Sequence, residues 1–290
     1  MPSVLADFAG NVSVDSREWD PFVEGRIILG EDRLVLAADE DDKLTVPLSA
    51  VFDITVGSLP TAFDPMPGTP VVVAFEADGR RQAAAVSGEE ATIEKFVTVL
   101  FKAILNGTSV TLKHPAKVGG RVMDTDFRGS LLNLQSGGVV FDTEEGPLEI
   151  PLDGIIDFGR ETRAVDGTER PVLVVSHVDG GEALTTVAAV DSARKLSILG
   201  RYLRRTYDRI RESISQLTLS EAETETLTTL YSAGDVGLSL SSVLDSDPSR
   251  VKKLLHALHS KGLIESEDGG PVLTAKGQIV VTQYLERVNE

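Results

Sequence analysis

Side chains that could hold a metal or act as a strong nucleophile are few in this chain. It contains no cysteine, which excludes disulfides, thiolate zinc sites, iron–sulfur clusters and cysteine nucleophiles. His256 and His259 lie three residues apart, a spacing that brings both rings to one side of a helix. No third ligand stands at a recognisable spacing from them, so we expect two solvated histidines and no metal site.

Sequence motifs of known catalytic sites are also missing. The chain has no Gly-Lys-Ser/Thr phosphate loop and no Gly-x-Ser-x-Gly nucleophile elbow. Asp53 and Asp157 occupy equivalent positions of an internal repeat, each after a strand that contains Pro-Leu. That placement favours a duplicated turn or hydrogen-bonding role over a catalytic pair. We therefore expect a protein that is not an enzyme and that uses no catalytic residue and no cofactor.

The charge of the chain limits its partners. It has 45 acidic and 28 basic residues, a formal net charge of −17. Such a surface repels nucleic acids and anionic lipids unless basic residues gather in one place. Of the basic residues, 10 are lysine and 18 are arginine. An acid-rich, lysine-poor composition favours a salt-rich cytosol, where molar salt screens self-repulsion, over a merely soluble acidic protein.

Basic residues do gather in one segment, 191–216, which holds seven basic and three acidic side chains. At about 100° per residue, its apolar residues share one side of a helix, and Arg201, Arg204, Arg205 and Arg209 share the opposite side. Guanidinium groups bind carboxylate and phosphoryl oxygens in pairs, so this side could be a docking strip for an acidic partner. Pairing with the chain's own carboxylates is the equally weighted alternative.

An internal repeat organises the elements before that segment. At an offset of 104 residues, Leu44–Ile54 aligns with Leu148–Phe158, and four of the eleven positions are identical. In each copy, short apolar runs bounded by Gly, Asp and Pro predict strands, and a longer amphipathic stretch predicts a closing helix. The predicted strands of the first copy are 25–29, 33–37, 43–47, 51–56, 70–77 and 81–86.

The helix that closes each copy has a predicted start. Ser87-Gly-Glu-Glu90 reads as a capping box, and Asp191 takes the capping position in the second copy. A bent antiparallel sheet plugged by a helix is the pleckstrin-homology-like architecture. The sequence therefore predicts an α+β chain with two such domains in tandem, 1–110 and 111–216.

Short helices follow from residue 217 onward. The pattern predicts a helix after the capping box Ser220–Glu223, a brief helix at 240–244, and a helix from Asp247-Pro248 to Lys261. A two-stranded wing and a last helix capped by Thr274 complete the segment. Three helices, a hairpin and a closing helix predict a winged helix-turn-helix domain over 217–290.

The charge of this last domain argues against DNA binding. It has six basic and eleven acidic residues. One face of its third helix is mildly basic and carries Lys253 and His256, but the wing reads Glu265-Ser-Glu-Asp268, where phosphate contacts would be needed. We therefore favour a winged helix that contacts protein and expect no nucleic-acid partner.

The assembly resembles the CheF family of archaeal chemotaxis and taxis adaptors along essentially its full length. The resemblance rests on two copies of the Pro-Leu-containing module (Val46-Pro-Leu48 and Ile150-Pro-Leu152), a long arginine-bearing helix and an acidic winged helix. It implies a non-enzymatic adaptor in chemotaxis and phototaxis. Such an adaptor binds the response regulator CheY, preferentially when phosphorylated, and connects it to the cytoplasmic motor proteins of the archaellum. CheC and CheD are further partners that the resemblance implies.

Two other functions compete with this expectation. One is a winged-helix transcription regulator with an N-terminal sensing region, and the other is a lipid-binding scaffold, which the acidic loops predict against. The sequence shows no secretory signal and no apolar run of membrane-spanning length, so we expect a cytoplasmic protein without membrane insertion. Arg201, Arg204, Arg205, Arg209, Lys253 and His256 are the candidate partner-binding residues.

Overall fold

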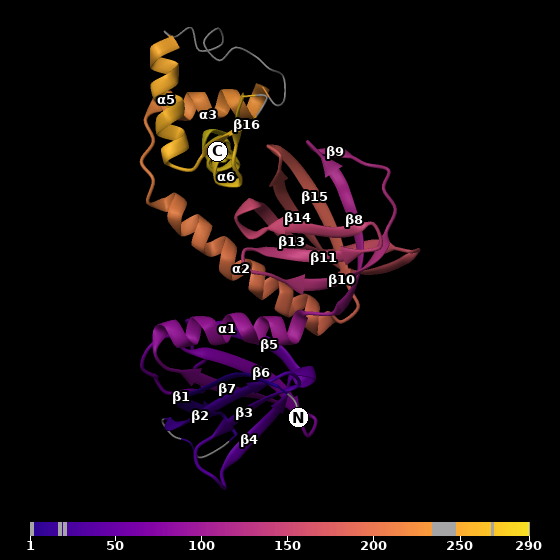
Figure 1. Ribbon diagram of the computed structural model, residues 1–290, viewed down its shortest axis with the longest axis vertical. Helices are drawn as coiled ribbons and strands as arrows, with labels where there is room; N and C mark the ends of the chain where they lie inside the picture. The colour runs from indigo at the N-terminus through magenta and orange to yellow at the C-terminus, as the bar shows by residue number, and fades with distance from the viewer. Residues whose placement is uncertain (1–2, 17–18, 20–21, 234–247, 268–269, 290) are drawn as a thin grey trace. The chain divides into compact units, whose positions relative to one another are not determined.

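The computed structural model describes residues 3–16, 19, 22–233, 248–267 and 270–289 (Figure 1). It is a mixed α+β structure with two large antiparallel sheets and several helices. The contacts divide the chain into two compact units. The first unit contains Met1–Val110, Leu131–Leu134 and Val190–Tyr202, and the second contains Thr111–Ser130, Gln135–Ala189 and Leu203–Glu290.

The first sheet has seven strands in the order β4-β3-β2-β1-β7-β6-β5. Alternation of buried and exposed residues, as in Arg33–Ala37, turns one face of each strand toward the core. The six strands predicted from the sequence are all present, with small changes at their ends. The strands are β1 (Val4–Val14), β2 (Val23–Gly30), β3 (Arg33–Ala37), β4 (Lys43–Pro47), β5 (Val51–Val56), β6 (Val71–Ala77) and β7 (Arg80–Ser87).

Strand β1 was not among the predicted strands, although it lies at the centre of the sheet. Its residues up to Val12 pair with β2, and its last four pair with β7. A strand is usually recognised in a sequence by a run of apolar residues. In β1 only the last three residues, ending at Val14, form a continuous buried run, and its first residues are mostly exposed. A central strand that is half exposed therefore escapes a search for apolar runs.

Helix α1 (Glu90–Leu105) lies across one end of this curved sheet (Figure 1). Its apolar face is buried, and the Phe96 ring meets Phe8 of β1 edge-on at 5.3 Å between ring centroids. The predicted capping box is wrong in its first residue. Ser87 is the buried last residue of β7, and the Glu89 carboxylate instead accepts hydrogen bonds from the amides of Ala91 and Thr92.

The second sheet has the strand order β12-β11-β10-β8-β15-β14-β13, with β9 paired to β8 outside that path. Apart from β9, the strand order is the same as in the first sheet. Strand β8 takes the place of β1, strands β10 to β12 take the places of β2 to β4, and strands β13 to β15 take the places of β5 to β7. The strands are β8 (Thr108–Val118), β9 (Arg121–Val122), β10 (Arg128–Leu134), β11 (Gly138–Thr143), β12 (Gly146–Pro151), β13 (Ile155–Val165), β14 (Thr168–Asp179) and β15 (Glu182–Val190).

The two sheets also share their local irregularities. A one-turn 3-10 helix, η1 (Leu48–Ala50) or η2 (Leu152–Gly154), follows the Pro-Leu strand in each copy. The next strand then shifts its register between Val51 and Asp53 in one copy and between Ile155 and Asp157 in the other. The same defect at aligned residues supports the repeat that the sequence indicates.

Helix α2 (Ala193–Ser215) follows β15 and contributes residues to both units. The helix begins at Ala193, one residue later than a cap at Asp191 predicts, and the Ser192 hydroxyl accepts from the Lys195 amide at 3.3 Å. Two expectations stay predictions: that this helix closes the second sheet, and that the two sheets are pleckstrin-homology-like domains.

Within the described residues, the C-terminal part of the second unit contains three helices and a hairpin. They are α3 (Glu221–Ala233), α5 (Pro248–Ser260), β16 (Ile264–Glu267), β17 (Gly270–Leu273) and α6 (Ala275–Asn289). Its core joins side chains from each helix and from the hairpin, with Leu227, Leu258 and Leu263 fully buried. The winged-helix assignment stays a prediction, and the brief helix predicted at 240–244 and the cap Asp247 lie outside the described residues.

The predicted ends of these helices are confirmed where they are described. Ser220 and Glu223 form the reciprocal capping box, with the Ser220 amide donating to the Glu223 carboxylate at 2.8 Å. Gly262 ends α5 in the left-handed region, and the Thr274 hydroxyl caps α6. None of the helices in the described ranges combines the length and the apolar character that a membrane crossing requires.

Replacing a helical glycine by alanine should have opposite effects on stability at Gly200 and at Gly277. A Cβ atom at Gly277 would collide with the carbonyl oxygen of Leu263, whereas a Cβ atom at Gly200 would meet nothing within 4 Å. Glycine inside a helix ordinarily costs about 1 kcal/mol relative to alanine. We expect Gly200→Ala to raise the thermal unfolding midpoint and Gly277→Ala to lower it. An equal rise in both variants would contradict the close approach of α6 to Leu263.

Candidate functional site

The candidate site is the basic side of α2, which the sequence singles out by its charge. The helix is amphipathic, and Leu196, Leu199, Leu203 and Ile214 of the predicted apolar stripe are buried. Ile198 is buried as well, although it lies outside that stripe. Burial of this stripe orients the helix and leaves its arginines on the more exposed side.

Arg201 already has a partner in the first unit. Its Nε and Nη2 atoms donate to Oδ1 and Oδ2 of Asp53 at 2.9 and 3.0 Å. This is the parallel two-bond geometry that a guanidinium and a carboxylate prefer. The Arg201 side chain is 53% exposed and the Asp53 side chain 29%, so water competes for both groups. The alternative of internal pairing therefore holds for this arginine.

Asp53 is well placed for that contact. It is the residue at which the register of β5 shifts, and its Oδ1 also accepts from the Ile54 amide at 3.0 Å. The shift leaves its side chain near the strand's own backbone amide and turned toward Arg201. The hydrogen-bonding role expected for Asp53 is thus confirmed, and no catalytic role is needed to explain it.

Arg194 and Lys195 make further contacts in the first unit. Nη2 of Arg194 donates to a carboxylate oxygen of Glu76 at 2.5 Å, and Nζ of Lys195 donates to the Thr108 hydroxyl at 2.9 Å. The ring of Tyr202 lies 5.4 Å from the ring of Phe101 on α1. The first half of α2 is therefore held by polar and apolar contacts together.

Arg204 has a different environment, in the second unit. Its guanidinium lies over the Phe158 ring at 5.1 Å, and Tyr207 meets the same ring edge-on at 5.7 Å. Burial raises the pKa of the Tyr207 hydroxyl, and the nearby negative charge of Asp157 adds to the effect. Asp157 thus lies close to α2, like its repeat equivalent Asp53. Arg204 itself stays exposed and keeps its guanidinium hydrogen atoms available to a partner.

The other candidate residues lie on two helices. Arg205 is half-buried and Arg209 is exposed on α2. Lys253 and His256 are exposed on α5, where they lie three residues apart. Within the part of the chain that the structure describes, no three His, Asp or Glu side chains are grouped so that they could hold a metal ion.

Two histidines that the sequence did not single out form a pair in the second unit, with His177 buried and His114 half-buried. The rings of His114 and His177 stack 5.7 Å apart, and both contact the hydroxyl of Thr186, from Nδ1 of His114 at 2.8 Å and Nε2 of His177 at 3.1 Å. His177 is 1% exposed, and its Nδ1 atom has no hydrogen-bond partner in the described structure. The residues come from three strands, so no local motif could have revealed them.

Both histidines resist protonation. Burial lowers the pKa of His177 to about 4, and the neighbouring His114 contributes further. Burial also lowers the pKa of His114, with the Arg128 guanidinium as the next cause, while the negative charge of Asp179 opposes the change in both. Both rings therefore favour the neutral form, with His177 buried in the core and His114 half-buried beside it.

The Arg201–Asp53 pair can be measured by a double-mutant cycle. With Arg201→Ala, Asp53→Ala and the double variant, we expect a coupling free energy of about 0.5–1 kcal/mol at low salt. At an ionic strength of about 1 M, where the screening length is about 3 Å, the coupling should fall. A coupling that does not depend on salt would contradict a solvent-accessible ion pair.

The histidine pair predicts acid sensitivity. Because the folded protein lowers the pKa of His177 from 6.5 to about 4, the unfolded chain takes up the proton first as pH falls. Stability should decline between pH 6.5 and about 4, by up to about 3 kcal/mol. In His177→Gln the free energy of unfolding should fall less over this window, as measured by urea titrations at each pH. Equal pH dependence in both proteins would contradict this assignment.

Comparisons with known proteins place the chain in a family. Residues 4–209 match the model of the archaeal chemotaxis signal transduction system protein F. The chain is 37% identical to taxis protein CheF2 of Halobacterium salinarum, over 99% of both chains. It is 28% identical to taxis protein CheF1 of the same organism, over 83% of this chain and 81% of that protein. The chain therefore belongs to the CheF family of archaeal chemotaxis signalling proteins.

Proposed function

We propose that this protein is a non-enzymatic cytoplasmic adaptor in archaeal chemotaxis and phototaxis. In this role it links phosphorylated CheY to the cytoplasmic motor proteins of the archaellum, with CheC and CheD as further partners. The observation that carries the proposal is the match to taxis protein CheF2, which extends over 99% of both chains. A match of that extent covers every predicted domain, so the proposal concerns the whole chain.

The architecture supports a role in binding proteins. We infer that residues 1–110 and 111–216 are pleckstrin-homology-like domains, because two sheets with the same strand order each precede a helix. We infer a winged-helix domain at 217–290 from helices α3, α5 and α6 and the hairpin of β16 and β17. Its strand β16 carries the exposed carboxylate of Glu265, which repels DNA. Such domains act through their surfaces and need no catalytic residue.

We propose that the basic side of α2 contacts an acidic surface of a partner, with Arg204 and Arg209 as the exposed guanidinium groups. Arg201 takes part in the same contact by exchanging Asp53 for a carboxylate of the partner. Arg205 lies on the helix between Arg204 and Arg209. Lys253 and His256 on α5 form a second basic contact. The support is local: α2 is positively charged within a chain whose net charge is −17. Opposite charges of this kind speed association and select the partner.

A binding experiment tests the adaptor role. The immobilised full-length chain is incubated with purified CheY, with and without beryllium fluoride as a mimic of the acyl phosphate. We expect recovery of CheY to rise at least about tenfold with the mimic. Equal recovery under both conditions would refute recognition of the phosphorylated form, and a sequence-selective DNA complex at the same salt would favour the regulator alternative.

The arginines are tested by a matched pair of variants. Replacement of Arg201, Arg204 and Arg205 by Ser should weaken binding of activated CheY at least about tenfold. Asp53→Asn breaks the same internal pair but leaves Arg201 in place, so binding should be kept or strengthened. If both variants lose binding equally, the effect comes from the lost internal pair, and the docking role of α2 is refuted.

A further inference from the structure

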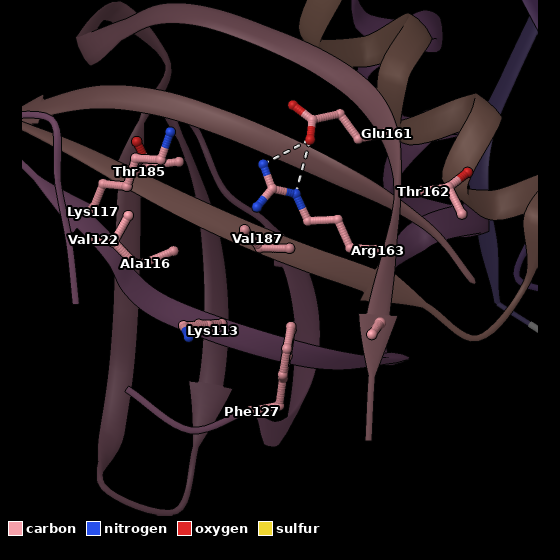
Figure 2. Close-up of a pocket in the computed structure, with 11 residues that line it drawn as sticks. Lys113, Ala116, Lys117, Val122, Phe127, Glu161, Thr162, Arg163, Thr185 and Val187 are labelled. Carbon is pink, nitrogen blue, oxygen red and sulfur yellow. Dashed lines mark hydrogen bonds and ion pairs between the residues drawn. The ribbon is translucent and has the colours of Figure 1, made fainter. Parts of the chain in front are cut away.

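A pocket of about 500 Å³ lies against the second sheet (Figure 2). Side chains from β8, β9, β13 and β15 line it together with Phe127. Lys113, Lys117 and Arg163 supply three positive charges, and Glu161 supplies the single negative charge. The pocket is thus locally positive, although the 80 residues from 111 to 190 carry more acidic than basic side chains.

One wall of the pocket is the edge of a strand. Four consecutive residues of β13, Glu161 to Ala164, line the pocket. Side chains of a strand alternate between its two faces, so four in succession can border one cavity only where the strand's edge faces it. By contrast, β15 contributes Thr185 and Val187, two residues apart, as a strand does when it presents a face. The backbone of β13 therefore borders the pocket.

That edge has no strand beside it. Among the strands that the structure describes, β13 stands last in its sheet and pairs only with β14. Glu161, Thr162 and Ala164 are exposed. An exposed strand edge offers a row of backbone donors and acceptors to another extended chain. The edge can thus bind a peptide through its main chain, whatever the side chains are.

The floor of the pocket is apolar. Ala116 and Val187 belong to a small buried cluster, and the Phe127 ring packs against that cluster. Val122 on β9 is 70% exposed, the highest value among the large exposed apolar side chains of the described residues. An exposed valine beside a partly buried ring favours an apolar side chain from a ligand.

The basic groups are spread around this floor. Nζ of Lys113 lies 6.0 Å from the centre of the Phe127 ring, and Lys117 makes no ion pair within the described residues. Arg163 is bonded to Glu161, with Nη2 and Oε2 2.7 Å apart, as Figure 2 shows. A dense polyanion such as an inositol phosphate would meet the Glu161 carboxylate at close range. Single carboxylates spaced along a peptide can reach the two lysines and stay away from the Glu161 carboxylate.

We propose that this pocket binds an extended acidic peptide segment of a partner protein. The peptide adds to the edge of β13 through main-chain hydrogen bonds and places an apolar side chain against Phe127, Val122 and Val187. Its carboxylates pair with Lys113 and Lys117. The site is separate from α2 and from Lys253 and His256, and it does not depend on the function proposed above for those residues.

The test uses the full-length isotope-labelled protein and a defined probe. The probe is an end-capped peptide of eight residues in which valine alternates with glutamate. We expect its addition to shift the backbone amide resonances of 161–164 and those of Lys113 and Lys117. A probe with N-methyl groups on alternate amides cannot form the strand pairing and should bind at least about tenfold more weakly.

Charge-reversal variants separate the pocket from general electrostatics. Lys113→Glu with Lys117→Glu should weaken probe binding at least about tenfold, because both cations are replaced by repulsive charges. The matched control, Lys95→Glu on α1 with Lys252→Glu on α5, makes the same change in net charge at two exposed lysines outside the proposed binding surfaces and should leave the affinity unchanged. Equal losses in both variants would overturn the proposal in favour of nonspecific attraction.

Three other outcomes would overturn the proposal. Absence of shifts at 161–164 would rule out the strand edge as a binding surface. Inositol hexakisphosphate that binds at the pocket and displaces the peptide would identify a phosphate ligand. Self-association of the chain that disappears in the Lys113→Glu, Lys117→Glu variant, measured by sedimentation, would identify a second copy as the occupant.

Discussion

The burial of α1 against the first sheet is the packing on which the rest of the first unit depends. A curved antiparallel sheet has an apolar interior that must be covered at its open end, and Phe96 and Leu100 of α1 are fully buried there. With α1 held in place, its Phe101 ring meets Tyr202 at the middle of α2. Ion pairs from Arg194 to Glu76 and from Arg201 to Asp53 complete the attachment at the surface. Apolar packing therefore positions the helix, and the charged contacts refine its orientation.

Positive charge is scarce in this protein, so its location carries information. With 28 basic side chains against 45 acidic ones, an exposed cation can pair with a carboxylate of the chain itself. Arg201 shows the consequence, because it is bonded to Asp53 and must exchange that carboxylate to bind another. Arg204 is held over an aromatic ring, which leaves its donors available. The same distinction applies in the pocket of the second sheet, where Arg163 has a carboxylate partner and Lys113 lies over Phe127.

Local patterns in the sequence predicted most of the local structure. The strands of the first copy, the Ser220–Glu223 capping box and the Gly262 helix end depend on interactions within a few residues, and each is confirmed. Strand β1 was missed because its first residues are exposed and its partners, β2 and β7, are distant in sequence. The cap of α1 was misplaced for a related reason. Ser87 has the right chemistry for a cap, but it is buried as the last residue of β7.

The sequence by itself determined the repeat, the charge reversal on α2 and the resemblance to the family, because composition, periodicity and self-similarity are properties of the chain alone. Only the tertiary structure decided which arginine meets which acid, since Arg201 and Asp53 are 148 positions apart. It also brought His114 and His177 together around Thr186 and placed residues 161–164 of β13 on the same pocket as Lys113 and Lys117. These contacts join strands far apart in the chain. Their partners are selected by the register and curvature of a whole sheet, which no local pattern encodes.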